Sequence, residues 1–217
     1  YAPKTLLQKK SWKKEYNTEM LVATKINNKY RVVMKPKGYL VGNNVIKLYF
    51  KDKDAEIISK INLYALMAIL NSSIMDKIVF QYIINKSELT VAFYDSITMF
   101  TPLKSLNSDS LLSQILSNLA KNCLFLRKEP KFSPGHSILY ESITNIIDLF
   151  CELLYYHPNF NIDSFISRCI DKNSMVQLLI DKSFKKQIDL NTNSIKNTVS
   201  EIYDDLICEK NILLGEK

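Results

Sequence analysis

Glycine is scarce in this sequence, with 4 residues among 217. Few positions can therefore use the positive backbone φ angles that glycine adopts without strain. This scarcity argues against a dinucleotide-binding fold, whose phosphate loop is rich in glycine, and against a β-barrel with many tight turns. A P-loop nucleotide site is excluded as well, because the chain contains no G-x-x-x-x-G-K-[ST] motif.

Metal-binding cysteine patterns and long apolar runs are also missing. The four cysteines, Cys123, Cys151, Cys169 and Cys208, form no C-x-x-C pair, so the spacing of zinc ligands is absent. We expect them to be buried, reduced thiols of a cytoplasmic protein. No apolar stretch approaches the roughly 20 residues that span a bilayer, and the lysine-rich start does not resemble a signal peptide. We expect no membrane partner, and the start at Tyr1 without methionine suggests a fragment.

Charge is distributed unevenly along the chain. The whole sequence carries a net charge of +7, but residues 1–60 contain 14 Lys and Arg against 5 Asp and Glu, a net of +9. The remaining residues contain 15 and 17 of these, a net of −2. A basic segment joined to a nearly neutral one is typical of a surface that binds a polyanion.

The first 103 residues favour a mixed α and β structure. Short runs rich in β-branched and aromatic residues predict strands, and Pro36-Lys37-Gly38 is a turn signal between two of them. The expected strands are residues 4–8, 20–24, 29–34, 39–50, 89–93 and 97–101. Helical spacing of apolar residues predicts helices over 56–70 and 73–84, after a charged loop at 51–56.

The pattern after residue 105 is helical throughout. Ser108-Asp109 is the expected cap of a helix that carries Leu111, Leu112 and Ile115. A long helix is expected from Ser133-Pro134 to about Tyr156, followed by helices over 163–170, 174–184 and 193–213, the last capped by Asn193 or Ser194. We therefore predict an α+β chain with two parts: a mixed α/β region with a small β-sheet at 1–105, and an all-helical region at 106–217.

No catalytic motif accompanies these elements. Asp52, Asp54 and Glu56 are the one group of closely spaced carboxylates in the basic region, and a metal-dependent nuclease needs such carboxylates to converge. Their spacing within a lysine-rich loop is typical of a solvated turn. We therefore name no catalytic, metal-binding or cofactor-binding residue in this chain.

The basic segment supplies the candidate binding residues. Lysine and arginine gain affinity for a duplex by releasing counterions from its phosphates, and asparagine can pair with two atoms of adenine in the major groove. The candidate phosphate contacts are Lys9, Lys10, Lys13, Lys14, Lys25, Lys29, Arg31, Lys35 and Lys37, and the candidate base readers are Asn27 and Asn28.

The order of features from 39 to 103 resembles the target-recognition domain of bacterial adenine-N6 DNA methyltransferases from restriction–modification systems. Such domains carry a strand, here 45–50, and then an apolar helix that closes in Leu-Asn-Ser, here Leu70-Asn71-Ser72. A proline-containing segment, Phe100-Thr101-Pro102-Leu103, follows, and the upstream residues 3–8 resemble the family's entry strand.

The resemblance implies a module that reads a short site on double-stranded DNA. A separate catalytic methyltransferase domain or subunit would use S-adenosylmethionine and flip the target adenine out of the stack. This chain would then not be catalytic alone. Two other hypotheses stay open: a helical protein-interaction or scaffold module, for which Leu111, Leu112 and Ile115 should be exposed, and a nuclease built around the carboxylates at 52–56.

Overall fold

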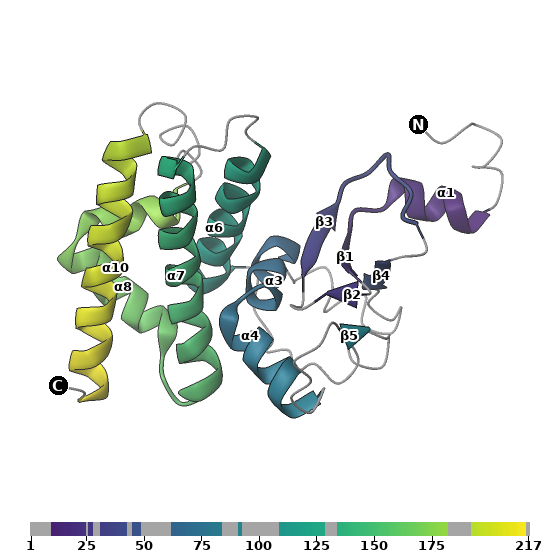
Figure 1. The fold of residues 1–217 in the computed structure, drawn as a ribbon. Helices are drawn as coiled ribbons and strands as arrows, with labels where there is room; N and C mark the ends of the chain where they lie inside the picture. The colour runs from purple at the N-terminus through teal and green to yellow at the C-terminus, as the bar shows by residue number, and fades with distance from the viewer. Residues whose placement is uncertain are drawn as a thin grey trace. The chain divides into compact units, whose positions relative to one another are not determined.

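The computed structural model is α+β, as predicted, with a small antiparallel sheet in the N-terminal half and mainly helices in the C-terminal half (Figure 1). The structure describes residues 10–24, 26–27, 31–42, 45–48, 62–83, 91–92, 109–128, 134–181 and 192–215. The chain divides into two compact units: unit 1 comprises residues 1–59 and 75–103, and unit 2 comprises residues 60–74 and 104–217.

The core of unit 1 is a three-stranded antiparallel sheet with the strand order β3-β1-β4. The central strand β1 (Met20–Thr24) pairs with β3 (Val32–Lys35) on one edge and with β4 (Val45–Leu48) on the other. The apolar run Met-Leu-Val-Ala of β1 is buried at every position, which is typical of a strand covered on both faces. The strand predicted at 20–24 is confirmed.

Two smaller elements of unit 1 lie outside this sheet. A second sheet pairs β2 (Ile26–Asn27) with β5 (Val91–Ala92), within the strand predicted at 89–93. Helix α1 (Lys10–Asn17) precedes β1, and the sequence pattern did not predict it. The strands expected at 4–8 and 97–101 lie outside the described residues.

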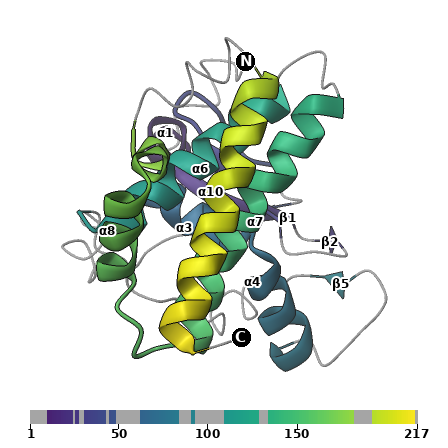
Figure 2. The same ribbon diagram turned by 90° about the vertical axis from the view of Figure 1, so that its left-hand side faces the viewer.

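Unit 2 is a bundle of helices. In chain order it contains α3 (Leu63–Leu70), α6 (Leu111–Lys128), α7 (Pro134–Tyr156), α8 (Ile162–Lys172), the 3₁₀ helix η4 (Ser174–Leu179) and α10 (Thr192–Leu214). Helices α7 and α10 pack side by side over most of their length (Figure 2). The predicted helix from Pro134 to Tyr156 is confirmed, and the helix expected over 174–184 is instead a 3₁₀ helix that ends at Leu179.

The predicted helix caps in unit 2 were wrong in position. The Oγ of Ser110 accepts a hydrogen bond from the N–H of Ser113 at 3.1 Å, so the residue next to the helix caps α6 rather than Ser108 or Asp109. Helix α10 begins at Thr192, which places Asn193 and Ser194 inside its first turn. Local side-chain chemistry marks a helix start only to within a few residues.

Helix α3 explains why residues 60–74 belong to unit 2 rather than to the predicted N-terminal region 1–105. The helix starts at Leu63, because the Oδ1 of Asn62 accepts hydrogen bonds from the backbone N–H groups of Tyr64 and Ala65. Residues 56–61 of the helix predicted over 56–70 lie outside the described residues. Every residue from 65 to 70 is buried, since α3 packs against α6 and α7. A helix that is apolar on all sides needs such a core position.

The second predicted helix, 73–84, is observed as α4 (Ser73–Ile78) followed by a π-helical turn, η3 (Val79–Ile83). Among the described helices, none is long and apolar enough to cross a membrane by itself. Helix α3 and the segment Ser73–Gln81 meet that test only as a bent pair, by length and composition.

Candidate nucleic-acid interface

Helix α1 carries its lysines and its one carboxylate on different sides. Lys13, Lys14 and Asn17 are exposed, whereas Glu15 is only 8% exposed. Residues three and four apart in a helix share a face, so Lys13, Lys14 and Asn17 do so together with the backbone position of Lys10. The carboxylate between them points into unit 1 and leaves this outer face basic.

Glu15 is bound on both carboxylate oxygens by other elements of unit 1. Its Oε2 accepts a hydrogen bond from the Nζ of Lys47 on β4 at 2.5 Å, and its Oε1 accepts one from the backbone N–H of Val41 at 2.8 Å. Neither Glu15 nor Lys47 was predicted from the sequence to belong to this site. The available signal in the sequence was Glu15 itself, the one acid that directly follows a run of lysines. An isolated opposite charge at such a position is suited to an internal ion pair.

Lys35 is buried, which corrects its assignment as a phosphate contact. Only 5% of this residue is exposed. Its Nζ donates hydrogen bonds to the carbonyl oxygens of Glu15 at 2.8 Å, Pro36 at 3.1 Å and Tyr39 at 2.9 Å. An ammonium group has three donors, and all of them are used here. Lys35 therefore ties α1 to the loop after β3 and does not present its charge to a ligand.

The loop of residues 36–42 is the segment that these two side chains hold. We expected a strand from residue 39, but the polar groups of Tyr39 and Val41 are bound to Lys35 and Glu15 instead. Gly38 turns the chain with a φ of 88°, which suits glycine, and its N–H donates to the carbonyl of Tyr16 at 2.8 Å. The predicted turn at 36–38 thus packs against α1.

For Glu15 and for Lys35, burial shifts the pKa in one direction and the neighbouring opposite charge shifts it in the other. Burial raises the pKa of Glu15, but the hydrogen bonds from Lys47 and Val41 and the charges of Lys47 and Lys35 outweigh it, so the pKa lies below the ordinary value of 4.5. Burial lowers the pKa of Lys35 below 10.5, and the charge of Glu15 offsets this only in part. The cluster therefore favours an ionised Glu15 in the folded state.

Unit 1 is expected to lose stability in acid through Glu15. The unfolded chain binds a proton at this carboxyl near pH 4.5, whereas the folded chain binds it only at lower pH. The stabilisation is thus complete above pH 4.5 and is lost as the pH falls through the lower folded pKa. Lys35 stays protonated in both states over this range. Urea unfolding of the wild type and Glu15→Gln from pH 7 to pH 3 should show a difference that shrinks with falling pH; a constant difference would contradict this reading.

The structure brings together only some of the predicted binding residues. Lys13, Lys14 and Lys37 are exposed, Arg31 is half-buried beside β3, and Lys35 is buried. The backbones of Lys10 and Asn27 lie in α1 and β2, but their side chains are not among those described. The other candidates lie outside the described residues: Lys9, Lys25, Asn28 and Lys29. The carboxylates Asp52, Asp54 and Glu56 also lie outside them.

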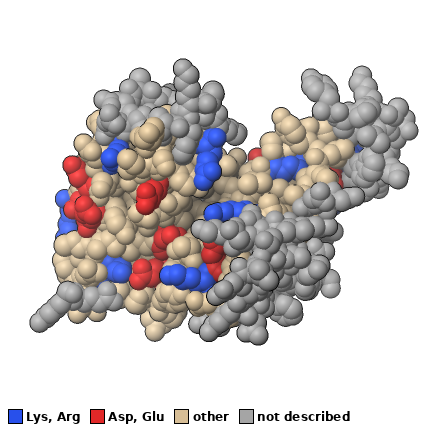
Figure 3. All heavy atoms as spheres, viewed as in Figure 1, with Lys and Arg blue, Asp and Glu red and all other residues tan. Residues whose placement is uncertain are grey.

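In unit 2 the charges of both signs are interspersed on the face seen in Figure 3. Lys210 on α10 forms an ion pair with Glu152 on α7 at 3.2 Å. Such pairs join neighbouring helices of the bundle. In unit 1 the exposed Lys13, Lys14 and Lys37 make no ion pair with the described part of the chain.

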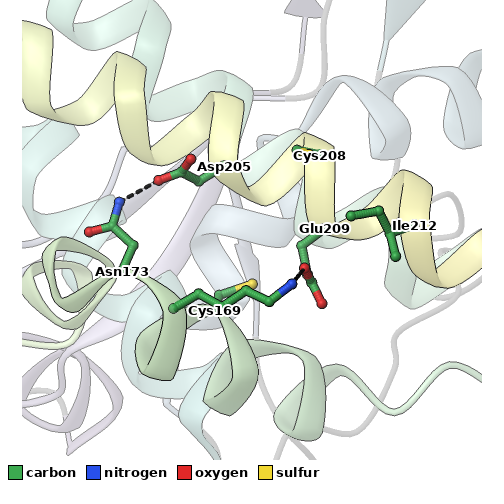
Figure 4. Close-up of a pocket in the computed structure, with 7 residues that line it drawn as sticks. Cys169, Asn173, Asp205, Cys208, Glu209 and Ile212 are labelled. Atoms are coloured by element: carbon green, nitrogen blue, oxygen red, sulfur yellow. Dashed lines mark hydrogen bonds and ion pairs between the residues drawn. The ribbon is translucent and has the colours of Figure 1, made fainter.

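A pocket of about 270 Å³ lies between α8 and α10 (Figure 4). Its charged centre is Glu209, which is 4% exposed and pairs with Lys172 and with Arg168, the latter at 3.1 Å. Within the described part of the chain the Oε1 of Glu209 accepts no hydrogen bond, so its contact with Arg168 is an ion pair without hydrogen-bond geometry. Asn173 also binds Asp205 across the pocket. Because Glu209 and Asp205 each have a partner, these contacts serve to join α8 and the residue that follows it to α10.

Two of the four cysteines are less buried than expected. Cys151 and Cys169 are buried, Cys123 is half-buried and Cys208 is exposed, and all four are free thiols. Burial raises the pKa of Cys123, Cys151 and Cys169 to about 12, so these thiols are poor nucleophiles. No group of three or more metal-ligating side chains occurs among the residues that the structure describes.

The Leu-Asn-Ser end of α3 has a structural role of its own. The Nδ2 of Asn71 donates to the carbonyl of Met67 at 2.9 Å, and the Oγ of Ser72 donates to that of Ile69 at 2.7 Å. The N–H of Ser73 donates to the Oδ1 of Asp148 on α7 at 2.8 Å. These bonds end one helix, start the next and attach both to α7, so folding alone accounts for these residues.

No protein-family model matches this sequence, and neither a curated protein nor a solved structure does.

Proposed function

We propose that this chain is a DNA-recognition module of a restriction–modification or adenine-N6 DNA methyltransferase system. In this proposal unit 1 contacts double-stranded DNA in the cytoplasm. A catalytic methyltransferase domain or subunit, outside this sequence, binds S-adenosylmethionine and carries out the chemistry. The chain itself supplies contacts to the phosphates and to base edges.

The arrangement of α1 is the observation that carries this proposal. Its one carboxylate, Glu15, is bound inside unit 1 by Lys47 and Val41. Lys13 and Lys14 consequently face solvent with no acid of their own helix beside them, and the sequence around them has a net charge of +9 over residues 1–60. A helix that hides its only acid and exposes its lysines is suited to the negative potential of a duplex.

The burial or half-burial of Leu111, Leu112 and Ile115 does not support the alternative of a helical scaffold module, which needs these residues to be exposed. Leu112 is 4% exposed and Ile115 is fully buried, while Leu111 is half-buried. Helix α6 uses this face to pack against α3 and α7. The exposed apolar helix face that a docking surface needs is therefore not present at these positions.

Reversing the charge of Lys13 and Lys14 should weaken DNA binding and its dependence on salt. For B-DNA, the slope of log K against log salt is about −0.9 for each neutralised phosphate, so Lys13→Glu with Lys14→Glu should reduce the slope by about 2. Fluorescence anisotropy of a labelled duplex, titrated between about 50 and 200 mM salt, measures this slope.

The matched control places the same charge reversal in unit 2. Lys121→Glu with Lys196→Glu changes the net charge equally but alters α6 and α10. We expect the control to keep most of the wild-type slope. Equal losses from both double variants would indicate a general charge effect rather than a site on α1, and absence of wild-type binding at the lower salt concentration would count against the proposal.

A further inference from the structure

Tyr39 is the most exposed of the large apolar or aromatic side chains that the structure describes. It is 63% exposed, and its ring makes no aromatic or cation–π contact with the described part of the chain. It follows Lys37 and Gly38, which are also exposed. The tip of the 36–42 loop therefore presents an aromatic ring and a cation to solvent.

The backbone below this ring is fixed on both sides. The carbonyl of Tyr39 itself accepts a hydrogen bond from the buried Lys35 at 2.9 Å. One residue before it, the N–H of Gly38 binds the carbonyl of Tyr16 at 2.8 Å, and two residues after it, the N–H of Val41 binds Glu15 at 2.8 Å. These bonds restrain the backbone from which the ring of Tyr39 projects.

The bond that restrains the carbonyl of Tyr39 comes from a buried lysine, and burying that charged group costs free energy. A buried ammonium group loses hydration, and the lowered pKa of Lys35 reflects that loss. Pre-organising an exposed aromatic residue has a use in binding, because less conformational freedom is lost when a ligand stacks on it.

We propose that Tyr39 is a stacking platform for an unpaired DNA base beside the basic face of α1. Every base has a π face, so an aromatic ring can receive it without reading its identity. The bond between Gly38 and Tyr16 places the loop next to α1, and Lys13 lies three residues, about 4.5 Å along the helix axis, before Tyr16. The lysines and the ring can then contact neighbouring phosphates and a base of one strand.

This inference rests on the proposed function, since it names the form of DNA that the same unit prefers. The probes are two labelled duplexes of the same sequence, one fully paired and one with a single unpaired adenine. The wild-type chain should bind the second more tightly. Tyr39→Ala should weaken binding of that duplex by about 5- to 100-fold and leave binding of the paired duplex nearly unchanged.

Tyr39→Phe is the matched control, because it keeps the ring and removes only the hydroxyl group. It should retain the preference for the unpaired base. A second readout is the fluorescence of 2-aminopurine at the unpaired position, which should be quenched by the wild type and by Tyr39→Phe but not by Tyr39→Ala. Hydrogen exchange of the β1 amides verifies that each variant is folded.

The outcomes separate this inference from the function on which it rests. If the α1 charge reversal lowers the salt slope but Tyr39→Ala binds both duplexes like the wild type, the stacking role is wrong and DNA recognition stands. If Tyr39→Phe loses as much as Tyr39→Ala, the hydroxyl group rather than the ring makes the contact, and the inference is overturned. If the wild type binds neither duplex, both proposals fail.

Discussion

Replacing Glu15 with alanine is expected to lower the free energy of unfolding of unit 1 by about 3 kcal/mol. The substitution leaves Lys47 without its ion pair and the N–H of Val41 without its acceptor, and it removes the charge that offsets burial of Lys35. Removing one partner of a buried pair is costly because the other charge remains where water cannot fully solvate it. Hydrogen exchange of the backbone amides of β1 measures the change.

The control for this prediction is Glu19→Ala, which removes an exposed carboxylate from the residue just before β1. We expect it to change stability by no more than about 0.5 kcal/mol. Glu15→Ala should also weaken binding to the duplex with the unpaired adenine, because the loop that carries Tyr39 loses the bond between the N–H of Val41 and the Glu15 carboxylate, one of its attachments to α1. If β1 exchanges at the wild-type rate in Glu15→Ala, the carboxylate is not the anchor that the contacts indicate.

Replacing Phe150 with alanine is expected to lower the free energy of unfolding of unit 2 by about 3–5 kcal/mol. Phe150 is fully buried on α7, and its ring meets that of Phe165 on α8 edge to face, with 6.5 Å between the centroids. The substitution removes a large apolar side chain and leaves a cavity that rigid neighbouring helices fill only partly. Urea unfolding followed by circular dichroism, together with exchange of the α7 amides, measures the loss.

Tyr156→Ala provides the comparison within the same helix. Tyr156 is 53% exposed at the end of α7, so its truncation should cost far less than that of Phe150. The pair also tests the division of the chain, since Phe150→Ala should reduce protection in α7 by more than in β1. Equal costs for the two substitutions would mean that α7 does not pack in the core of unit 2 as described.

Elements with strong local signals were predicted well. Pro134 marks the first turn of α7, and the pair His157-Pro158 prevents its continuation, so both ends of this helix follow from short-range chemistry. The continuous apolar run of β1 likewise predicts a strand that is buried on both faces. The caps of α6 and α10 were displaced because several neighbouring polar residues can each accept the first free N–H groups of a helix.

The α+β class, the basic character of the first 60 residues and the positions of the long helices follow from the sequence. The exposure of each lysine and the unit to which α3 belongs depend on tertiary contacts. Lys35 and Lys37 look alike in the sequence, but contacts to Glu15 across 20 residues bury the first and leave the second in water. Such contacts join segments far apart in the chain, and the local periodicity of charge and apolar residues contains no information about them.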